Sequence, residues 1–390
     1  MKILIVRTFP DILNINAYNV QEIGLAKALV KQGNVCDIVL YHGKRPDTEE
    51  VLYFDDRETG QRYQIKIYWM RGFNLVKNGI MPSVMKILSQ YDVIQVNDYD
   101  MIFSWMLYTK PQKPTVVYHG LYQSDYTKGY NLKCFVFDRM FLPFRSYQDV
   151  IAITKSNLAA DFLRNKGFRK VFPLGVGVDD DNFVHREGRD ENSSLLPVKE
   201  KVRLLYIGKI EDRRNSIWLL ELLEKLLGKS DQFELVIIGK GEAEYYRKFM
   251  EKASAHIKNG NLIYIPEVTQ KQMTEIYPFC DVFLFPSNYE IFGMVLLEAM
   301  YFGLPVISSM NGGSSVLIDD GVDGRIIQSF EWDCWEEAVL QLIRNEDVRK
   351  EMGRKAGEKI RSRFLWSSLG KKFEEVYRKA INEFNGEESC

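Results

Sequence analysis

The chain has few of the residues that build disulfide frameworks and metal centres. Its 390 residues include five cysteines and four histidines. The cysteines are scattered and form no C-x-x-C pair, so the sequence indicates neither a disulfide scaffold nor a zinc-binding module. Such sparse cysteines are typical of proteins from a reducing compartment, and we therefore expect a cytoplasmic protein.

The chain also lacks an excess of charge of one sign and a long uninterrupted apolar run. Its formal net charge is −1 and its pI is about 6.5, so no overall field attracts nucleic acid, which we do not expect as a partner. The most apolar stretch, residues 291–310, contains Glu298, Gly303 and Pro305, which argue against a membrane span. The apolar start of the chain is interrupted by Arg7 and is too short for a signal peptide.

Strand-like apolar runs alternate with helix-like segments along most of the chain, which predicts doubly wound, mostly parallel sheets. The alternation lapses into a polar, turn-rich stretch and then resumes. We therefore predict two α/β domains, 1–174 and 201–364, joined by a linker at 175–200. Strands are expected at 3–6, 37–41, 65–69, 93–96, 115–118 and 150–153, and then at 203–207, 234–238, 262–265, 282–285 and 306–309. Helices of the first domain are expected at 18–31, 83–90, 99–107 and 155–166.

Residues 281–309 carry the strongest functional pattern. A buried strand, DVFLFP, precedes a loop with Glu290, a helix predicted from about Gly293 to Tyr301, and a second strand. The free N–H groups of the first helical turn favour anions. Glu298 lies eight positions after Glu290, so two carboxylates would flank one anion site. Because like charges repel, these carboxylates suit the neutral hydroxyls of a ligand whose phosphates lie at the helix end.

The same stretch resembles the E-x7-E signature of retaining GT-B glycosyltransferases, above all glycosyltransferase family four, usually P-S-x-x-E-G-F-G-x-x-x-x-E-A-x-x-x-G-x-P-V. The matching residues are Pro286, Ser287, Glu290, Phe292, Gly293, Glu298, Ala299, Gly303, Pro305 and Val306. Ile291 stands where glycine is common. The resemblance covers most of the chain and is closer in the second domain. It implies a GT-B fold, with two Rossmann-like domains facing across a cleft and the final helix, 365–384, crossing back to the first domain.

This resemblance implies a retaining transferase that moves a hexose from a UDP- or GDP-sugar to a glycan or lipid-linked acceptor, as in cell-surface polysaccharide or glycolipid synthesis. The first domain would bind the acceptor, at the inner face of the membrane where that acceptor is lipid-linked. Glu298 would hold the ribose hydroxyls and Glu290 the donor-sugar hydroxyls. The backbone at Phe292, Gly293 and Met294 would bind the diphosphate. No metal or other cofactor is expected.

Two cations follow the first strand of the second domain. Lys209 and Arg214 stand five positions apart, directly after Gly208, and cations at a strand end suit a diphosphate. The stretch resembles the family's G-R-x-x-x-x-K with the two cation types exchanged, which implies that it binds the diphosphate and stabilises charge on the leaving group. A surface charge cluster is the alternative interpretation.

His119 follows the predicted strand 115–118, at the strand end where ligands of α/β sheets bind. An imidazole can donate or accept a proton near neutral pH. The position resembles the family's histidine beside the donor sugar. We therefore group His119 with Glu290, Lys209 and Arg214 as candidate catalytic residues, and the alternative is a histidine that caps the next turn.

Three weaker motifs complete the candidate donor site and its surroundings. Asp98-Tyr99-Asp100 has the D-x-D pattern that binds a metal–diphosphate in GT-A enzymes, but helix capping or binding of an acceptor hydroxyl is favoured here. Asn16, in the first loop, stands where the family often has glycine, and its amide can donate a hydrogen bond to the donor. An ordinary polar loop between strand and helix is the equally supported alternative. Val268 lies in the segment that lines the nucleobase in relatives.

Glycines mark two further turns of the second domain. Gly239 and Gly241 resemble the family's G-x-G turn, while Gly312 and Gly313 suit a tight turn near a ligand. Val316 stands where the family has a glutamate after this second turn, so one expected polar contact is in doubt.

Basic and aromatic residues alternate in 128–145, KGYNLKCFVFDRMFLPFR. Such a segment can dock on an anionic membrane surface, which would make the protein a peripheral membrane protein. A partly buried helix with a solvated basic edge is the equally supported alternative.

Two other functions fit the same chain. One is another GT-B chemistry, such as nucleotide-sugar epimerisation, which an assay for free sugar isomers would reveal. The other is a non-catalytic subunit that binds the donor or acts as a scaffold. The departures at Asn16-Ala17 and Val316 favour that subunit, whereas the intact Glu290, Glu298, Lys209 and Arg214 argue against it.

Overall fold

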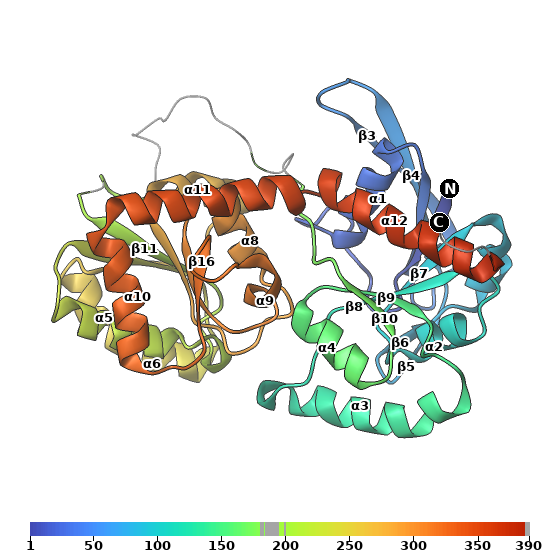
Figure 1. Cartoon of the computed structure of the whole chain (residues 1–390), viewed down its shortest axis with the longest axis horizontal. Coiled ribbons are helices and arrows are strands. Elements are labelled where there is room, and N and C mark those ends of the chain that lie inside the picture. The colour runs from blue at the N-terminus through green and yellow to red at the C-terminus, as the bar shows by residue number, and fades with distance from the viewer. Residues whose placement is uncertain (180–182, 184–194, 199, 387–390) are drawn as a thin grey trace. The chain divides into compact units, whose positions relative to one another are not determined.

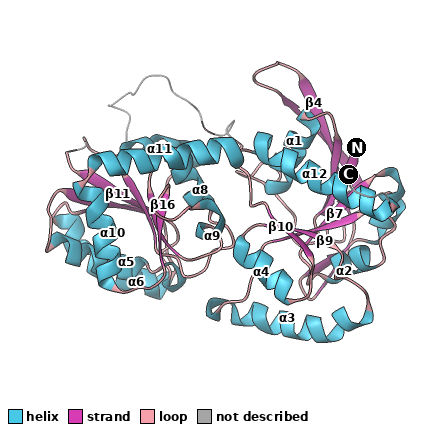
Figure 2. Cartoon of the chain, in the orientation of Figure 1, coloured by secondary structure: helices cyan, strands magenta, loops and turns pink. Residues whose placement is uncertain are grey.

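The computed structural model describes residues 1–179, 183, 195–198 and 200–386 (Figure 1). The chain forms two compact units, of which the first is Met1–Asp179 with Phe364–Cys390 and the second is Asp180–Arg363. The predicted linker at 175–200 lies partly outside the described residues. Helices flank the sheet of each unit (Figure 2), so both units have the predicted α/β layering.

The first unit is built on a mostly parallel sheet. Its strands are β1 (Lys2–Val6), β2 (Val35–Tyr41), β3 (Thr48–Asp55), β4 (Arg62–Met70), β7 (Val93–Asn97), β8 (Thr115–His119), β9 (Ile151–Thr154) and β10 (Lys170–Pro173). Among the described residues they pair in the order β10-β9-β8-β7-β1-β2-β4-β3, and β3 is antiparallel to β4. A separate hairpin joins β5 (Phe73–Leu75) to β6 (Asn78–Ile80).

The helices of the first unit follow the prediction with one exception. They are α1 (Gln21–Lys31), α2 (Ile102–Thr109), α3 (Lys128–Met140), α4 (Asn157–Asn165) and α12 (Trp366–Asn385). The helix predicted at 83–90 is wrong, because that segment forms two short 3-10 helices, Pro82–Lys86 and Leu88–Gln90. Backbone N–H groups of this segment donate to carbonyl oxygens three residues earlier, as that of Val84 does to Met81. Pro82 stands in the first turn.

The last helix completes the cover of the first sheet. Trp366 of α12 lies against Gly24 and Gly177, where an added Cβ would come within 2.5 Å of the indole. Farther along the helix, the Tyr377 hydroxyl donates to Gln95 Oε1 on β7 (2.5 Å), and Lys170 on β10 pairs with Glu383 (2.6 Å). The predicted return of the final helix to the first domain is therefore confirmed.

The second unit is built on a parallel sheet that reverses its order in the middle. Its strands are β11 (Val202–Ile207), β12 (Phe233–Ile238), β13 (Leu262–Ile265), β14 (Val282–Phe285), β15 (Val306–Ser309) and β16 (Gly324–Ile327). Among the described residues they pair in the order β13-β12-β11-β14-β15-β16. The chain winds outward in one direction from β11 and in the other from β14, and ligands of open α/β sheets bind at such a switch point.

Helices of the second unit bury its apolar strands on both sides. They are α5 (Ser216–Leu227), α6 (Ala243–Lys258), α7 (Gln270–Ile276), α8 (Met294–Tyr301), α9 (Ser314–Leu317), α10 (Trp332–Arg344) and α11 (Glu346–Arg363). Trp335 of α10 is fully buried in the core with Leu220 of α5 and Ile237 of β12. Within the described parts of the chain, no helix is both long enough and apolar enough to cross a bilayer.

Candidate functional site

Two glycine turns close on each other at the carboxyl ends of β11 and β12. Gly239 has a φ of +151°, and a Cβ at that position would lie 1.8 Å from the carbonyl oxygen of Gly208. A Cβ at Gly208 would lie 2.6 Å from Nη1 of Arg214. Gly239 therefore requires glycine, because two backbones meet there, whereas Gly208 leaves room for the end of the Arg214 side chain at the strand end.

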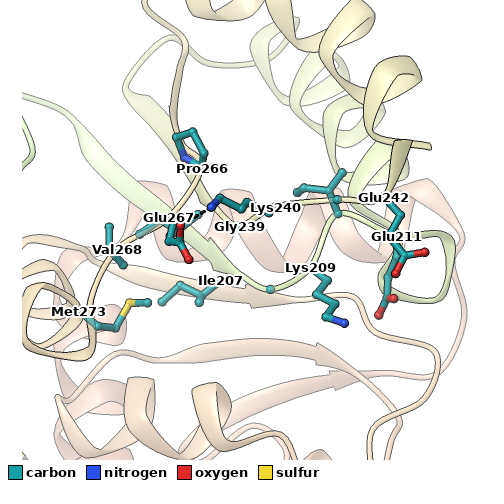
Figure 3. Close-up of a pocket in the computed structure, with 14 residues that line it drawn as sticks. Ile207, Lys209, Glu211, Gly239, Lys240, Glu242, Pro266, Glu267, Val268 and Met273 are labelled. Carbon is teal, nitrogen blue, oxygen red and sulfur yellow. Dashed lines mark hydrogen bonds and ion pairs between the residues drawn. The ribbon is translucent and has the colours of Figure 1, made fainter. Parts of the chain in front are cut away.

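A pocket of about 420 Å³ opens between the loops that follow β11, β12 and β13 (Figure 3). Three residues predicted for the site, Gly208, Lys209 and Val268, contribute to its wall. The complete wall consists of Ile207, Gly208, Lys209, Ile210, Glu211, Ile238, Gly239, Lys240, Gly241, Glu242, Pro266, Glu267, Val268 and Met273.

The pocket has an apolar end and a charged end. Figure 3 shows Val268 and Met273 at one end, and Lys209 and Glu211 at the other. On the rim between them, Lys240 pairs with Glu267, and both side chains are exposed, so this pair adds little stability. The pocket thus offers an apolar slot for a flat ring and cations for an anionic group.

Arg214 and Glu290 form the centre of an ion-pair network beside this pocket. Arg214 Nη2 lies 3.0 Å from Glu290 Oε1, and Arg213 Nη1 lies 3.4 Å from the same oxygen. Glu211 accepts from both arginines, at 2.7 Å from Arg213 and 3.2 Å from Arg214. The adjacency of β11 and β14 explains the network, because the loops that follow these two strands carry its members.

Backbone contacts hold these two loops together. Asn215, with a φ of +54°, donates from its side chain to the carbonyl oxygen of Pro286 (2.8 Å), and the N–H of Asn288 donates to the carbonyl oxygen of Arg213 (3.0 Å). Glu290 is thereby held where it is nearly buried. Burial raises the pKa of Glu290 above its ordinary value, although the charges of Arg214 and Arg213 oppose the shift.

The helix start after Glu290 has the predicted form. Gly293, with a φ of +76°, caps α8, and the first helical N–H groups that bond back to it belong to Leu296 and Leu297. The earlier N–H groups of the turn, such as that of Met294, therefore point out of the helix end. This end can accept an anion, as the sequence predicts for the backbone at Phe292–Met294.

Gly312 and Gly313 support the Glu290 loop. The N–H of Gly312 donates to the carbonyl oxygen of Glu290 (3.0 Å). A Cβ at Gly312 would lie 2.3 Å from that oxygen, and one at Gly313 would lie 1.8 Å from the carbonyl oxygen of Phe292. The glycine pair therefore lets its own backbone approach the backbone of the Glu290 loop closely. This contact holds the loop, and with it the Glu290 carboxylate, in place.

Glu298 lies in the middle of α8 and is buried. The hydroxyl of Tyr277, which is also buried, donates to Glu298 Oε2 (2.9 Å). Tyr277 in turn stacks on Phe302 at a centroid distance of 5.1 Å. The tyrosine therefore orients the carboxylate that the sequence assigns to a ribose.

In the first unit, His119 belongs to a buried polar cluster. Its Nδ1 lies 2.8 Å from Asp98 Oδ1, and the N–H of Gly120 donates to the same oxygen (3.3 Å). Burial alone would raise the pKa of Asp98, but these hydrogen bonds and the charge of His119 lower it below the ordinary value. His119 is fully buried, with 0% exposure, and its Nε2 has no hydrogen-bond partner among the described residues.

Asp100 adds a second carboxylate to this cluster. Its Oδ2 lies 2.7 Å from Nζ of Lys133, yet burial and the charge of Asp98 raise its pKa. Asp98, Asp100 and His119 place one ligand atom each within 4.8 Å of one another. Oxygen and imidazole ligands suit a divalent cation, but here Asp98 and His119 bond each other and Lys133 supplies the positive charge. Lys133 thus pairs with one of the two carboxylates, and His119 bonds the other.

Asn16 lies in an exposed turn of the first unit. Its N–H donates to Asn14 Oδ1 (3.1 Å), and the N–H of Ala17 donates to the carbonyl oxygen of Asn14 (3.0 Å). The turn follows β1, so it lies at the carboxyl edge of the first sheet, as does the end of β8 that carries His119.

Several residues that shape these sites were not predicted from the sequence. Arg213 and Glu211 stand beside the predicted cations, so the mixture of acidic and basic residues after Gly208 could have indicated them. The contact of Tyr277 with Glu298 and the bond between Asp98 and His119 could not be predicted, because each joins distant segments of the chain. Asp98 and His119 meet because β7 and β8 are neighbours in the sheet. Met273 carried no signal, because methionine fills gaps in many environments.

Comparison with known sequences finds similarity mainly in the second unit. Residues 189–359 match the model of the family "Glycosyl transferases group 1". A probable sucrose-phosphate synthase of Thermosipho melanesiensis is 25% identical over 208 residues, which are 52% of this chain and 46% of that protein. A D-inositol 3-phosphate glycosyltransferase of Saccharomonospora viridis is 26% identical over 220 residues, 55% of this chain and 51% of that protein. The chain thus spans about half the length of the curated relatives it matches.

Comparison with solved structures identifies the fold of the whole chain. A sucrose-phosphate synthase from Thermosynechococcus elongatus gives a TM-score of 0.69 at 15% identity, covering 98% of this chain and 100% of that one. Anabaena HepE, solved in complex with UDP, gives 0.69 at 14% identity and covers 97% of this chain and 100% of its own. The fold is therefore GT-B, as the sequence predicts.

Proposed function

We propose that the chain, whose residues 189–359 match the model of the family "Glycosyl transferases group 1", transfers a hexose from a nucleotide-sugar to a glycan or lipid-linked acceptor with retention of configuration. The observation that supports this best is the polarity of the pocket in the second unit. Its apolar end suits a nucleobase, and its charged end continues to Lys209, Arg214 and Glu290. A nucleoside diphosphate has the same polarity from base to phosphate.

Each residue has a role in the proposed donor complex. Val268 and Met273 contact the base, and Glu298, oriented by Tyr277, accepts hydrogen bonds from the ribose hydroxyls. Lys209, Arg214 and the first N–H groups of α8 bind the diphosphate. Glu290 is then released from Arg214 to accept hydrogen bonds from the hydroxyls of the sugar.

The proposed reaction exchanges one bond at the anomeric carbon. The bond from that carbon to the phosphate oxygen breaks, and a bond to the acceptor oxygen forms on the same face. The leaving phosphate takes the proton of the acceptor hydroxyl, while Lys209 and Arg214 stabilise its growing negative charge. In the first unit, Asn16 and His119 are proposed donor contacts. Because His119 is fully buried in this structure, its contact with the donor requires movement of the side chains that bury it.

Thermal-shift measurements with nucleoside diphosphates and nucleotide-sugars test the donor site. A ligand of the folded state raises the unfolding midpoint by mass action, and we expect one class, UDP or GDP, to do so. Glu298→Gln keeps the side-chain volume but loses the charge, so the affinity should fall about tenfold or more. Glu336→Gln, a buried glutamate of α10 that pairs with Lys229, is the matched control and should bind normally. If no nucleotide shifts the midpoint at millimolar concentration, the proposed donor site is wrong.

We also expect turnover to continue when divalent cations are chelated. The proposed site neutralises the diphosphate with Lys209 and Arg214, and in the Asp98–Asp100–His119 cluster Asp100 already pairs with Lys133. Initial rates are to be compared with and without EDTA, and the anomeric configuration of the product is to be read by NMR. Loss of activity with EDTA that added Mg²⁺ or Mn²⁺ restores would contradict the proposal, and an inverted product would contradict retention.

The proposed location follows from the acceptor. Cys36, Cys134 and Cys280 are buried free thiols and Cys334 is an exposed one, which supports a reducing cytoplasm. Where the acceptor is lipid-linked, the protein would work at the inner face of the membrane, in polysaccharide or glycolipid synthesis.

A further inference from the structure

Helix α3 exposes a row of large apolar side chains. Leu132, Phe135, Val136 and Met140 are between 45% and 65% exposed, and Phe144, just after the helix, is 75% exposed. The first four recur at intervals of three, one and four residues, so they share one side of the helix. We call these five residues the α3 face. In Figure 1, α3 lies at the outer edge of its unit.

The α3 face is distinct from the side by which the helix packs on its own unit. Cys134 and Phe137 are buried, and Phe137 stacks on Phe141 at 4.9 Å and meets the edge of Tyr99 at 5.8 Å. The helix therefore has an apolar side turned inward and a second one turned outward. Several exposed apolar side chains gathered on one side of a helix are typical of an interaction site.

The charges near the α3 face select the kind of partner. Lys128 and Arg139 are exposed on the same helix, and Asp125 is the exposed carboxylate that precedes it. The helix's own carboxylate, Asp138, is engaged by Lys166 and by the hydroxyl of Tyr99 (3.0 Å). Exposed cations thus outnumber exposed carboxylates by two to one along residues 125–145.

We propose that the α3 face docks on an anionic phospholipid bilayer. Its apolar side chains would enter the boundary between headgroups and acyl chains, while Lys128 and Arg139 meet lipid phosphates. A second copy of the chain fits less well. The same face of a copy offers apolar groups and two exposed cations but only one exposed carboxylate, Asp125, so a cation would be buried unpaired. This docking concerns lipid alone and does not depend on sugar transfer.

Vesicle flotation tests the docking without any nucleotide or acceptor. The full chain is mixed with vesicles of phosphatidylcholine and phosphatidylglycerol at a ratio of about two to one, and with pure phosphatidylcholine vesicles. The wild type should float with the anionic vesicles, and less with the neutral ones. Replacing Phe135 and Phe144 together by serine should weaken partitioning at least about tenfold, because both rings would lose their burial in lipid.

A matched pair of variants controls for exposed aromatic residues in general. Tyr53→Ser with Phe384→Ser removes two exposed rings of the same unit, outside the α3 face, and should leave partitioning unchanged. Lys128→Gln with Arg139→Gln should reduce the preference for anionic over neutral vesicles. All three double variants change exposed residues, so their unfolding midpoints should match that of the wild type.

Three results would overturn the inference. The wild type could fail to float with either vesicle, or the Phe135→Ser/Phe144→Ser variant could float as well as the wild type. Light scattering without lipid could also show a dimer that this variant abolishes, which would make the α3 face an interface between copies. A protein that floats normally but turns over no nucleotide-sugar would refute the proposed function and leave the docking intact.

Discussion

Arg214→Ala should lower kcat/KM for the nucleotide-sugar by about a hundredfold to a thousandfold. The guanidinium lies against Gly208 and 3.0 Å from Glu290, and in the proposed donor complex it would neutralise charge on the leaving diphosphate. Its removal also takes the nearer of two arginines from the nearly buried Glu290 and leaves the more distant one, Arg213, at 3.4 Å. Steady-state kinetics with the donor found by the thermal-shift panel measure the effect.

Two further variants show whether this loss is specific. Arg214→Lys keeps the charge but not the planar fork, and should retain an intermediate activity. Arg247→Ala removes an exposed arginine of α6 that pairs with Glu251, and should leave kcat/KM unchanged. An Arg214→Ala enzyme that is folded and as active as the wild type would refute the role of the cation in the reaction.

Gly313→Ala should both destabilise the second unit and inactivate the enzyme. The backbone at Gly313 has an ordinary helical φ of −67°, so the change strains nothing by itself. The new Cβ, however, would lie 1.8 Å from the carbonyl oxygen of Phe292, and the two segments must separate. Overpacking of this kind costs about 1–3 kcal/mol of unfolding free energy. The displaced loop also carries Glu290, so donor turnover should fall with the unfolding midpoint.

Gly129→Ala is the matched control for this substitution. A Cβ at Gly129, in the first turn of α3, would meet no atom within 4 Å. The activity of this variant should therefore equal that of the wild type, and its thermal midpoint should be equal or slightly higher, because alanine favours a helix over glycine. If Gly313→Ala also left both unchanged, the contact between the glycine pair and the Glu290 loop would not support the site.

The strands that the sequence predicted share a clear physical signal. Strands buried on both faces, such as β1 and β14, are short apolar runs, and parallel sheets require such runs. The edge strand β3 was missed, because its residues are mostly exposed and it pairs antiparallel with β4. The helix predicted at 83–90 had enough apolar residues but opens at Pro82 and tightens into 3-10 turns.

The candidate site was predictable where local sequence determines it. The motif alone predicts Gly293 at the start of α8. The end of a predicted strand alone places the two cations that follow Gly208. The network around Glu290 was not predictable, because it depends on which loop lies beside which. The reversal of strand order brings Arg213 and Arg214 to Glu290, although 76 residues separate Arg214 from it in the chain. The burial of His119 was missed for the same reason, since Tyr99 and Phe162 surround its ring from other segments.

The membership of α12 in the first unit has a consequence for how the protein is made. In chain order, the second unit is an insertion between residue 179 and residue 364 of the first. During synthesis, the second unit therefore emerges complete while the first still lacks the helix that covers β7 and β8. Until Trp366 and Tyr377 leave the ribosome, the apolar surface around Gly24 and Gln95 stays uncovered. The first part of the chain to be synthesised is thus the last to finish folding, and it is the part that a nascent-chain chaperone would have to protect.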